Sequence, residues 1–372
     1  MNRRNTYSKL IDELRMRNSA FAVWSAPGAP FPEVLIGGEL LHLNGYPQLN
    51  GQEGFVFAPF RISEDSPLLL LRPEIRIRTP DEAAAFDPES LPVLPPCEKK
   101  EQNPYIIEKE DYLRDIQTAV QHIRRSGLSK VILSRLLSVA SQDESAGQLY
   151  MQLEASTPNA FVYLVNLPEA GLWMGASPES LLESHGRQME TVSLAGTQPR
   201  RPDGGYAWYT KEIEEQAFVS RYLLDVFHRF GVHPYTTRGP ETMESGRVAH
   251  LKTTFRFPAR TVHRQLGNFI EALHPTPAVC GLPRDKADRY ISRAERHDRR
   301  YYTGCLGPWQ LDGQLHLFVN LRCMELLPGR YLLYAGGGIT AHSVPGEEWT
   351  ETGNKAQTLL SAIESLQHHD IR

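Results

Sequence analysis

The chain has 372 residues, of which 41% are hydrophobic and 23% charged, as in an ordinary globular protein with a sizeable core. Its formal net charge is −4 and it has no dense basic run, so nucleic acid is not an expected partner. The longest aliphatic run, residues 68–71, is far too short to cross a bilayer, so we expect no membrane association.

Four widely spaced cysteines, without a Cys-x-x-Cys pair, argue against a zinc site or a disulfide framework. The basic N-terminus precedes an amphipathic helix pattern rather than an apolar signal core. We therefore expect reduced thiols and a cytoplasmic protein. Because no exposed heptad pattern is present, we also expect a monomer.

The N-terminal residues 1–104 predict a helix and several short strands. Leu10 and Leu14 lie in the helix pattern. The expected strands are residues 21–24, 34–36, 55–57 and 68–71. From residue 87 to residue 104 the composition shifts to proline and charged residues, which is typical of a linker.

After this segment the pattern becomes regular. An amphipathic helix is predicted over 109–126, with Tyr112, Ile116 and Val120 on one stripe. Ser145 and Gln148 have the spacing of a capping box that opens a further helix. Strands separated by turns are expected at residues 161–167, 172–176, 181–183 and 188–194.

The last third of the chain combines long helices with another hairpin. The longest helix pattern covers 210–230, and a final helix starts near Gly346. Between them, residues 315–321 and 331–334 are predicted to flank the turn at Pro328-Gly329. Hairpins that alternate with helices favour an α+β fold with largely antiparallel sheets over a doubly wound parallel sheet.

Lys130 stands at the mouth of a short apolar strand that follows a Gly/Ser turn. A lysine in this position can direct its ammonium group into a cavity, and burial lowers its pKa toward the range of a general base. For an isolated lysine, a solvated charge that protects a strand edge is the more frequent outcome. The functional interpretation therefore depends on the rest of the chain.

Two pairs of glutamates stand where apolar residues are expected. In the 210–230 helix, the apolar stripe through Val219 and Val226 extends backwards onto Glu215 and Glu212. Such a pair facing a core is costly unless a cation neutralises it.

The final helix repeats this arrangement. Its core face, marked by Leu359 and Ile363, extends backwards to Lys355, Glu351 and Glu348. Oxygen ligands without His or Cys indicate Mg²⁺. The alternative is that these acids only complement the dipoles of the two helices.

Other candidate residues are small or polar. The segment Leu194-Ala195-Gly196-Thr197 ends a strand and offers a backbone N–H and a hydroxyl, and Gly336-Gly337-Gly338 permits close backbone approach to a ligand. Arg322 ends an apolar strand and could clamp a carboxylate. By position alone, His274 is more often a structural loop histidine and Glu179 a solvated turn acid.

Together these segments resemble the chorismate-utilising enzymes, namely the isochorismate, salicylate, anthranilate and aminodeoxychorismate synthases. The resemblance covers about the C-terminal two-thirds of the chain. The matching stretches, in the order of the family, are residues 130–135, 175–179, 194–197, 211–219, 250–253, 273–281, 295–307, 319–323, 334–340 and 343–355.

The resemblance implies a four-layer α/β/β/α fold of two packed, largely antiparallel sheets flanked by helices. Residues 105–372 would form the chorismate-binding catalytic domain, and 1–104 a variable region that contributes strands to the same globule. It also implies Mg²⁺ that bridges a carboxylate of the substrate chorismate. Glu215 and Glu351 match the principal ligands, with Glu212 and Glu348 as the outer pair.

The family pattern also assigns substrate contacts. Lys355, Arg322 and the backbone of Gly337 and Gly338 match groups that hold the substrate carboxylates. The remaining matches surround the substrate ring, with Ala195, Gly196 and Thr197 in the adjacent loop and His274 near the reacting carbons.

Two positions, Lys130 and Ala195, discriminate within the family. Family members that use ammonia resemble this chain but carry glutamine at the position of Lys130. Members that add water carry lysine at that position, together with glutamate at the position of Glu179. Lys130 would activate water for attack at C2, and Glu179 would help the C4 hydroxyl to leave. Ala195 replaces the nucleophilic lysine frequent in aminodeoxychorismate synthases. The resemblance thus implies an isochorismate synthase, an isomerase whose product feeds menaquinone, catechol siderophore or salicylate synthesis.

The alternative is a salicylate synthase, which shares Lys130 and Glu179 and then eliminates pyruvate. The segment 273–279 is more similar to isochorismate synthases. The chain departs from the family pattern at Gln216, Val344, Gly346 and Cys280, which predicts weaker metal affinity and keeps a non-catalytic binding module as a further hypothesis.

Overall fold

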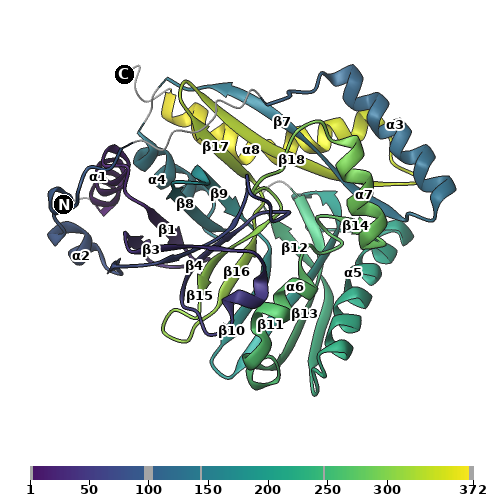
Figure 1. Ribbon diagram of the computed structural model, residues 1–372. Coiled ribbons are helices and arrows are strands. Elements are labelled where there is room, and N and C mark those ends of the chain that lie inside the picture. The colour runs from purple at the N-terminus through teal and green to yellow at the C-terminus, as the bar shows by residue number, and fades with distance from the viewer. Residues whose placement is uncertain (1–2, 96–103, 143–144, 246–247, 368–372) are drawn as a thin grey trace.

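The computed structural model describes residues 3–95, 104–142, 145–245 and 248–367 (Figure 1). Two nine-stranded sheets, here named A and B, form its centre, and all their strand pairs are antiparallel. Sheet A has the order β14 (Gly281–Leu282), β7 (Lys130–Ala140), β18 (Arg330–Thr340), β17 (Cys323–Leu327), β9 (Gly171–Ser177), β8 (Phe161–Leu167), β1 (Phe21–Ser25), β2 (Glu33–Ile36) and β6 (Ile75–Ile77). Sheet B has the order β12 (Thr236–Ser245), β13 (Val248–Pro258), β11 (Gln188–Pro199), β10 (Ser180–His185), β16 (His316–Val319), β15 (Cys305–Trp309), β4 (Gly54–Ala58), β5 (Leu68–Arg72) and β3 (Glu39–Leu43).

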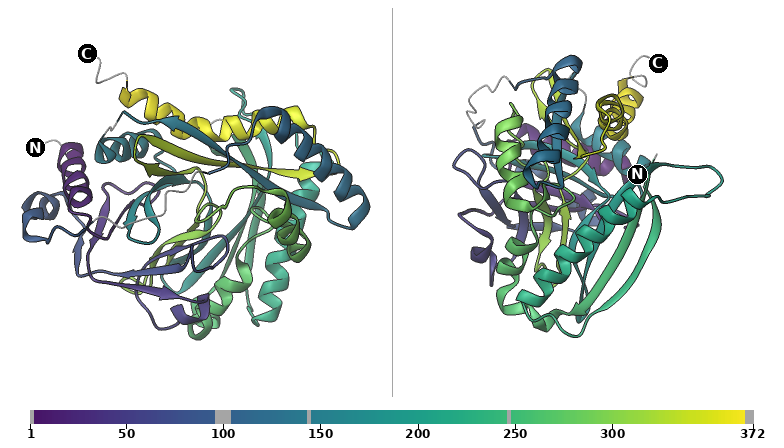
Figure 2. Two further views of the ribbon diagram at one scale, coloured as in Figure 1. Left: turned by 45° about the horizontal axis from the view of Figure 1, so that its top comes forward. Right: turned by 90° about the vertical axis from the view of Figure 1, so that its right-hand side faces the viewer.

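Helices cover the outer faces of both sheets. Figure 1 shows α8 running along β17, β18 and β7, and α5 and α6 lying beside the strands of sheet B. In the left-hand view of Figure 2, α8 lies along the upper side of the molecule and α5 and α6 lie in its lower half. The described helices are α1 (Arg3–Met16), α2 (Pro80–Ala85), α3 (Lys109–Ser126), α4 (Ala146–Ser156), α5 (Thr210–Arg229), α6 (Leu266–Leu273), α7 (Arg284–Ala294) and α8 (Pro345–Gln367).

Separate hydrophobic clusters fill the spaces between these layers. One cluster between the sheets includes Phe57, Trp173 and Leu306, which are fully buried. Another joins sheet A to α1, α4 and α8, and a third joins sheet B to α5 and α6. Burying apolar side chains on both faces of each sheet holds the four layers together. The predicted α+β fold with two packed antiparallel sheets and outer helices is confirmed.

The local signals in the sequence set several element ends. Helix α3 occupies the predicted residues 109–126, and Gly127 ends it in the left-handed conformation, with φ 66°. The Ser145 hydroxyl caps α4 by accepting a hydrogen bond from the Gln148 amide. Helix α5 follows the predicted stripe, with Val219 and Val226 buried.

The strands of the first 77 residues belong to both sheets. In sheet A, β1 pairs with β8, and in sheet B, β4 pairs with β15. Of the predicted linker at 87–104, residues 96–103 lie outside the described residues. No helix in the described part of the chain is both long and apolar enough to cross a membrane.

The predicted pairing of residues 315–321 with 331–334 is wrong. The strand β16 belongs to sheet B, whereas β18 belongs to sheet A and pairs with β17 and β7. The turn at Pro328-Gly329 therefore joins β17 to β18, while residues 320–322 cross from one sheet to the other. Arg322, one of the candidate substrate-binding residues, lies in this crossing.

Candidate active site

One pocket gathers nearly all the candidate residues. It lies where the first turns of α5 and α8 meet the ends of strands from both sheets. Every predicted site residue lines it except Thr197, whose side chain lies outside the described part, and His274. The lining residues that were predicted are Lys130, Glu179, Ala195, Gly196, Glu212, Glu215, Arg322, Gly337, Gly338, Glu348, Glu351 and Lys355.

The carboxylates enter this pocket from two helices. Glu212 and Glu215 lie in the first turns of α5, and the Glu212 carboxylate also accepts a hydrogen bond of 3.0 Å from the Tyr209 amide. Glu348 and Glu351 lie in the first turns of α8, and Glu348 is buried, with 5% exposure. The inward direction predicted for both pairs from helix periodicity is confirmed.

Lys130 is the first residue of β7 and is buried between β14 and β18. Its side chain runs across Gly338, where an added Cβ would lie 2.8 Å from Lys130 Cε. At the end of this path the ammonium group donates a hydrogen bond to the Glu215 carboxylate. Lys130 is therefore not a solvated edge charge but a cation held inside the pocket.

Glu179 reaches the same pocket from the turn between β9 and β10 and is only 7% exposed. Its amide donates to Ser177 Oγ and its carbonyl accepts from the Val319 amide, so its backbone is fixed. Burial raises the pKa of Glu179 from 4.5 to about 7, although Lys130 and Lys355 oppose this rise. Near neutral pH the group therefore exists both as an acid and as a carboxylate, as a general acid requires.

Arg322 and Lys355 add positive charge to the pocket. Arg322 adopts the left-handed conformation, with φ 47°, which is strained for a residue with a side chain. Burial lowers the pKa of its guanidinium group, and no ion pair ties that group to a carboxylate in the described residues. Lys355 Nζ lies 2.7 Å from Glu351 Oε1 and donates to the Gly336 carbonyl at 2.9 Å.

Glycine at position 337 leaves the room that the α8 carboxylates occupy. An added Cβ would lie 2.9 Å from Glu348 Oε2, closer than real Cβ contacts allow. Gly337→Ala is therefore expected to displace Glu348 and to lower kcat/KM for turnover at this site by about ten-fold or more. The control is Gly346→Ala, because nothing lies within 4 Å of an added Cβ at Gly346. Steady-state assays in which both variants match the wild type would show that this clearance is unimportant.

The loop beside the pocket depends on a histidine that the sequence analysis did not select. Gly196, with φ 70°, stands at a bulge of β11, and His250 Nδ1 lies 3.0 Å from its carbonyl oxygen. Burial lowers the pKa of His250 to about 4, so the ring is neutral near pH 7. The matched segment 250–253 contained this signal, since His250 is the polar residue that alternates with buried Ala249 and Leu251.

Aromatic and aliphatic residues complete the walls. Tyr302 and Tyr334 line the pocket with their rings 5.5 Å apart, and burial raises both phenol pKa values well above the usual range. Ile132, Leu194 and Val279 add apolar surface. The pocket thus offers neutral donors and apolar walls to a ring-shaped ligand.

His274 is a correction to the predicted site. It is 2% exposed, does not line the pocket, and lies with its ring centroid 6.0 Å from that of Tyr46. Burial lowers its pKa to about 3, so it is a neutral core residue. The lining residues from its loop are Ala278 and Val279 instead. Residue spacing did not indicate which side of this loop faces the ligand.

The charges of the pocket are unbalanced. Five glutamates face three cationic side chains, so the ionised lining carries a negative excess before any anionic ligand enters. No group of three or more His, Cys, Asp or Glu side chains in the described ranges is close enough to enclose a metal ion. Magnesium needs only one or two carboxylates together with waters and an anionic ligand, so the four glutamates from α5 and α8 fit Mg²⁺.

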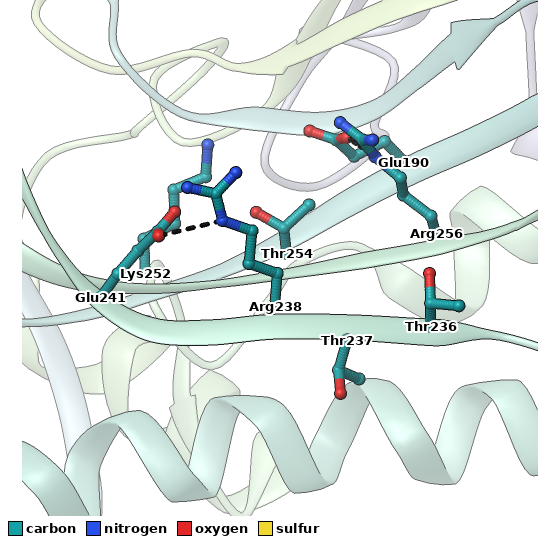
Figure 3. Close-up of a pocket in the computed structure, with 8 residues that line it drawn as sticks. All are labelled: Glu190, Thr236, Thr237, Arg238, Glu241, Lys252, Thr254 and Arg256. Atoms are coloured by element: carbon teal, nitrogen blue, oxygen red, sulfur yellow. Dashed lines mark hydrogen bonds and ion pairs between the residues drawn. The ribbon is translucent and has the colours of Figure 1, made fainter.

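A second hollow lies on the face of β12 and β13 that is turned away from α5 (Figure 3). Four of its charged side chains form ion pairs, with Arg238 Nε 3.2 Å from Glu241 Oε2 and Arg256 Nε 2.5 Å from Glu190 Oε2. The two arginine side chains are 81% and 62% exposed, respectively. This open surface lacks the buried groups of the first pocket and is not the candidate site.

The fold and the pocket define an enzyme-like carboxylate-rich site, and comparison with known proteins identifies its class. The sequence pattern of the chorismate binding enzymes matches residues 74–364, which is well over half of the chain. The chain therefore belongs to the chorismate binding enzyme family.

Several similar proteins within this family carry the name isochorismate synthase. The vibriobactin-specific isochorismate synthase of Vibrio cholerae is 32% identical over 68% of this chain and 66% of its own length. The isochorismate synthase EntC of Escherichia coli is 30% identical over 63% of this chain and 62% of its own length. The chain thus spans less than two thirds of these relatives. The crystal structure of DhbC from Bacillus anthracis, assigned as a 2,3-dihydroxybenzoate-specific isochorismate synthase, has a TM-score of 0.77 at 25% identity and covers 96% of this chain and 99% of that one. The predicted resemblance is confirmed.

Proposed function

We propose that this protein is a Mg²⁺-dependent isochorismate synthase, an isomerase that converts chorismate into isochorismate. The observation that carries the proposal is the presence of Lys130 and Glu179 in one buried pocket with four further glutamates. The names of the similar proteins support the same activity.

In this proposal Lys130 acts as the base and Glu179 as the acid. Lys130 Nζ takes a proton from water while the water oxygen forms a bond to C2 of chorismate. The double bonds shift, the bond from C4 to its hydroxyl breaks, and Glu179 protonates the departing hydroxyl, which leaves as water. One water enters and one leaves, so substrate and product are isomers. The proton on Lys130 must then return to Glu179, directly or through solvent, before the next turnover.

Two features of the pocket favour these roles. The pKa of Glu179, about 7, lets the group hold a proton at neutral pH and release it during the reaction. Lys130 points into the pocket but hydrogen bonds to Glu215. The amine must leave this contact and be free of its third proton before Nζ can accept one from water.

Glu215 and Glu351 would be the principal residues that hold Mg²⁺, with Glu212 and Glu348 as a further pair. A cation held there would supply the positive charge that offsets the acidic pairs and favours binding of an anionic substrate. Chorismate is a dianion, and the negative excess of the lining would repel it without such a cation.

The remaining residues would orient the substrate. We infer that Arg322, Lys355 and the backbone amides of Gly337 and Gly338 hold its carboxylates, because charged and backbone donors bind such groups strongly. The loop from Ala195 to Thr197 would lie beside the ring, braced by His250. The glycines let the backbone approach the ligand closely.

A product assay tests the function. Incubation of the protein with chorismate and Mg²⁺, followed by chromatographic separation, is expected to yield isochorismate, and removal of Mg²⁺ with a chelator should abolish turnover. Salicylate and pyruvate in place of isochorismate would identify a salicylate synthase. Anthranilate formed with ammonium would identify an ammonia-using lyase. Calorimetric binding of chorismate without turnover would contradict the enzyme and support a binding module.

A further inference from the structure

Arg135 is a buried cation outside the pocket. It lies on β7, five residues after Lys130, and is only 5% exposed. The other deeply buried arginines in the described ranges, Arg299 and Arg300, form ion pairs with Glu295 and Glu325. Arg135 has no such carboxylate partner among the described residues, so packing and a hydroxyl group must compensate its burial.

That compensation comes from the helix that carries two of the pocket glutamates. Arg135 Nε donates a hydrogen bond of 2.8 Å to Thr352 Oγ1 on α8. Its guanidinium carbon lies 3.6 Å from the centre of the Trp349 ring, also on α8, and 5.8 Å from that of Tyr112 on α3. A planar cation stacked on a tryptophan face and held by one hydrogen bond has a defined orientation.

The contacted residues alternate with site residues along α8. Glu348 and Trp349 are adjacent, as are Glu351 and Thr352, so a shift of one residue of a pair moves the other. Thr352 is fully buried, and its methyl carbon would lie 3.9 Å from a Cβ added at Gly337, which is also the residue beneath Glu348. The Arg135 contact therefore bears directly on the position of the α8 carboxylates above β18.

The charge of Arg135 acts at the same place. Burial is the main cause of the raised pKa of Tyr112, and Glu348, Arg135 and Glu351 are the next three, with Arg135 opposing the two glutamates. The charges of Arg135, Glu348 and Glu351 thus all act on the Tyr112 hydroxyl.

We propose that Arg135 is a positioning residue that fixes the acidic first turns of α8 against β7, and thereby sets the distance between Lys130 and the Glu348/Glu351 pair. Arg135 is not itself one of the residues that line the pocket, although it pairs across the sheet with the lining residue Ala335. Its effect on metal binding and turnover rests on the proposed function, whereas its effect on α8 does not.

The test compares three variants with a matched control. Arg135→Lys keeps the charge but loses the planar stack, Thr352→Val removes the hydroxyl at nearly constant volume, and Thr352→Ser keeps the hydroxyl. Arg124→Gln is the control, because the exposed Arg124 on α3 donates to the Ala341 carbonyl just before α8 but is not part of the stack. Calorimetric titration with Mg²⁺ alone measures the ion affinity, hydrogen–deuterium exchange measures the protection of residues 345–355, and steady-state kinetics separates kcat from KM.

Arg135→Lys and Thr352→Val are expected to weaken Mg²⁺ binding by about ten-fold, the usual cost of losing a group that orients a metal ligand. Exchange over 345–355 should become faster than in the rest of α8, kcat should fall, and KM should change less. Thr352→Ser and Arg124→Gln should match the wild type. If Arg135→Lys fails to fold, the comparison of Thr352→Val with Thr352→Ser still tests the proposal.

Unchanged exchange and unchanged Mg²⁺ affinity in folded Thr352→Val would overturn the proposal. A lower melting temperature with wild-type ion affinity and kinetics would also overturn it, since Arg135 would then serve stability alone. If the wild type binds no Mg²⁺, the proposed function fails, and exchange over 345–355 alone decides whether Arg135 positions α8.

Discussion

Replacing Lys130 by glutamine is expected to lower kcat for isochorismate formation by about 10²–10⁴-fold, the usual contribution of a positioned general base. Glutamine can still donate a hydrogen bond to Glu215, so the pocket should keep its shape, but its amide cannot accept a proton from water. Removal of this cation also takes away the first of the two charges that lower the pKa of Glu179. Glu179 should then stay protonated to higher pH, and the lost activity reports the base rather than the acid.

The measurement is steady-state product formation at saturating chorismate and Mg²⁺. Lys286→Gln is the control, because the ammonium group of Lys286 lies outside the pocket and donates to the Ser126 carbonyl at 3.0 Å. Activity of Lys130→Gln within a few-fold of the wild type would exclude Lys130 as the base. Production of a different compound by this variant would show instead that position 130 selects the nucleophile.

Replacing Glu179 by glutamine should lower kcat by a similar factor, about 10²–10⁴-fold, since an amide cannot deliver a proton to the C4 hydroxyl. The pKa of about 7 predicts that wild-type kcat/KM falls as the pH rises above 7, where the free enzyme loses the acid form. The pH profile of residual activity in Glu179→Gln should lack this limb. A limb that persists unchanged would assign the titration to another group.

Although Glu179→Gln should lower activity, it should raise the stability of the folded protein relative to the wild type at high pH. Folding raises the pKa of Glu179 from 4.5 to about 7, so this group favours the folded state below pH 4.5 and loses that contribution as the pH rises through 7. A shift of this size corresponds to about 3 kcal/mol. Urea unfolding at pH 5 and pH 8 should therefore show Glu179→Gln gaining stability over the wild type at the higher pH. An equal difference at both values would contradict this reading of the burial.

Much of the fold followed from local signals in the sequence. The periodicity of 109–126 predicted α3, and the apolar stripe of α5, extended backwards, predicted that Glu212 and Glu215 face inwards. These signals succeeded because the period of a helix links each residue to neighbours three or four positions away. The order of the strands could not be predicted in this way, and residues 315–321 were predicted to form a hairpin with 331–334, which lie in the other sheet. Strand order depends on packing between distant segments, which no local period records.

The site was predicted only where chemistry leaves a local mark. A charged residue on a core stripe, such as Glu351, is conspicuous in a sequence. Whether a loop residue faces a cavity is not, and His274 was expected at the pocket although Ala278 and Val279 of the same loop line it. Tyr302 and His250 were missed for the converse reason, since a buried tyrosine or histidine is common in cores.

The antiparallel pairing of β4 with β15 bears on how the chain folds. Phe57 pairs with Leu306, about 250 positions later, and β1 likewise pairs with β8, which is formed by a distant later segment of the chain. Such non-local pairing slows folding, and during synthesis the early strands emerge with unpaired edges that invite aggregation until their partners arrive. The pocket is completed later still, because Glu348, Glu351 and Lys355 lie within the last 25 residues. An incomplete chain would therefore contain most of both sheets and still lack half of its acidic centre.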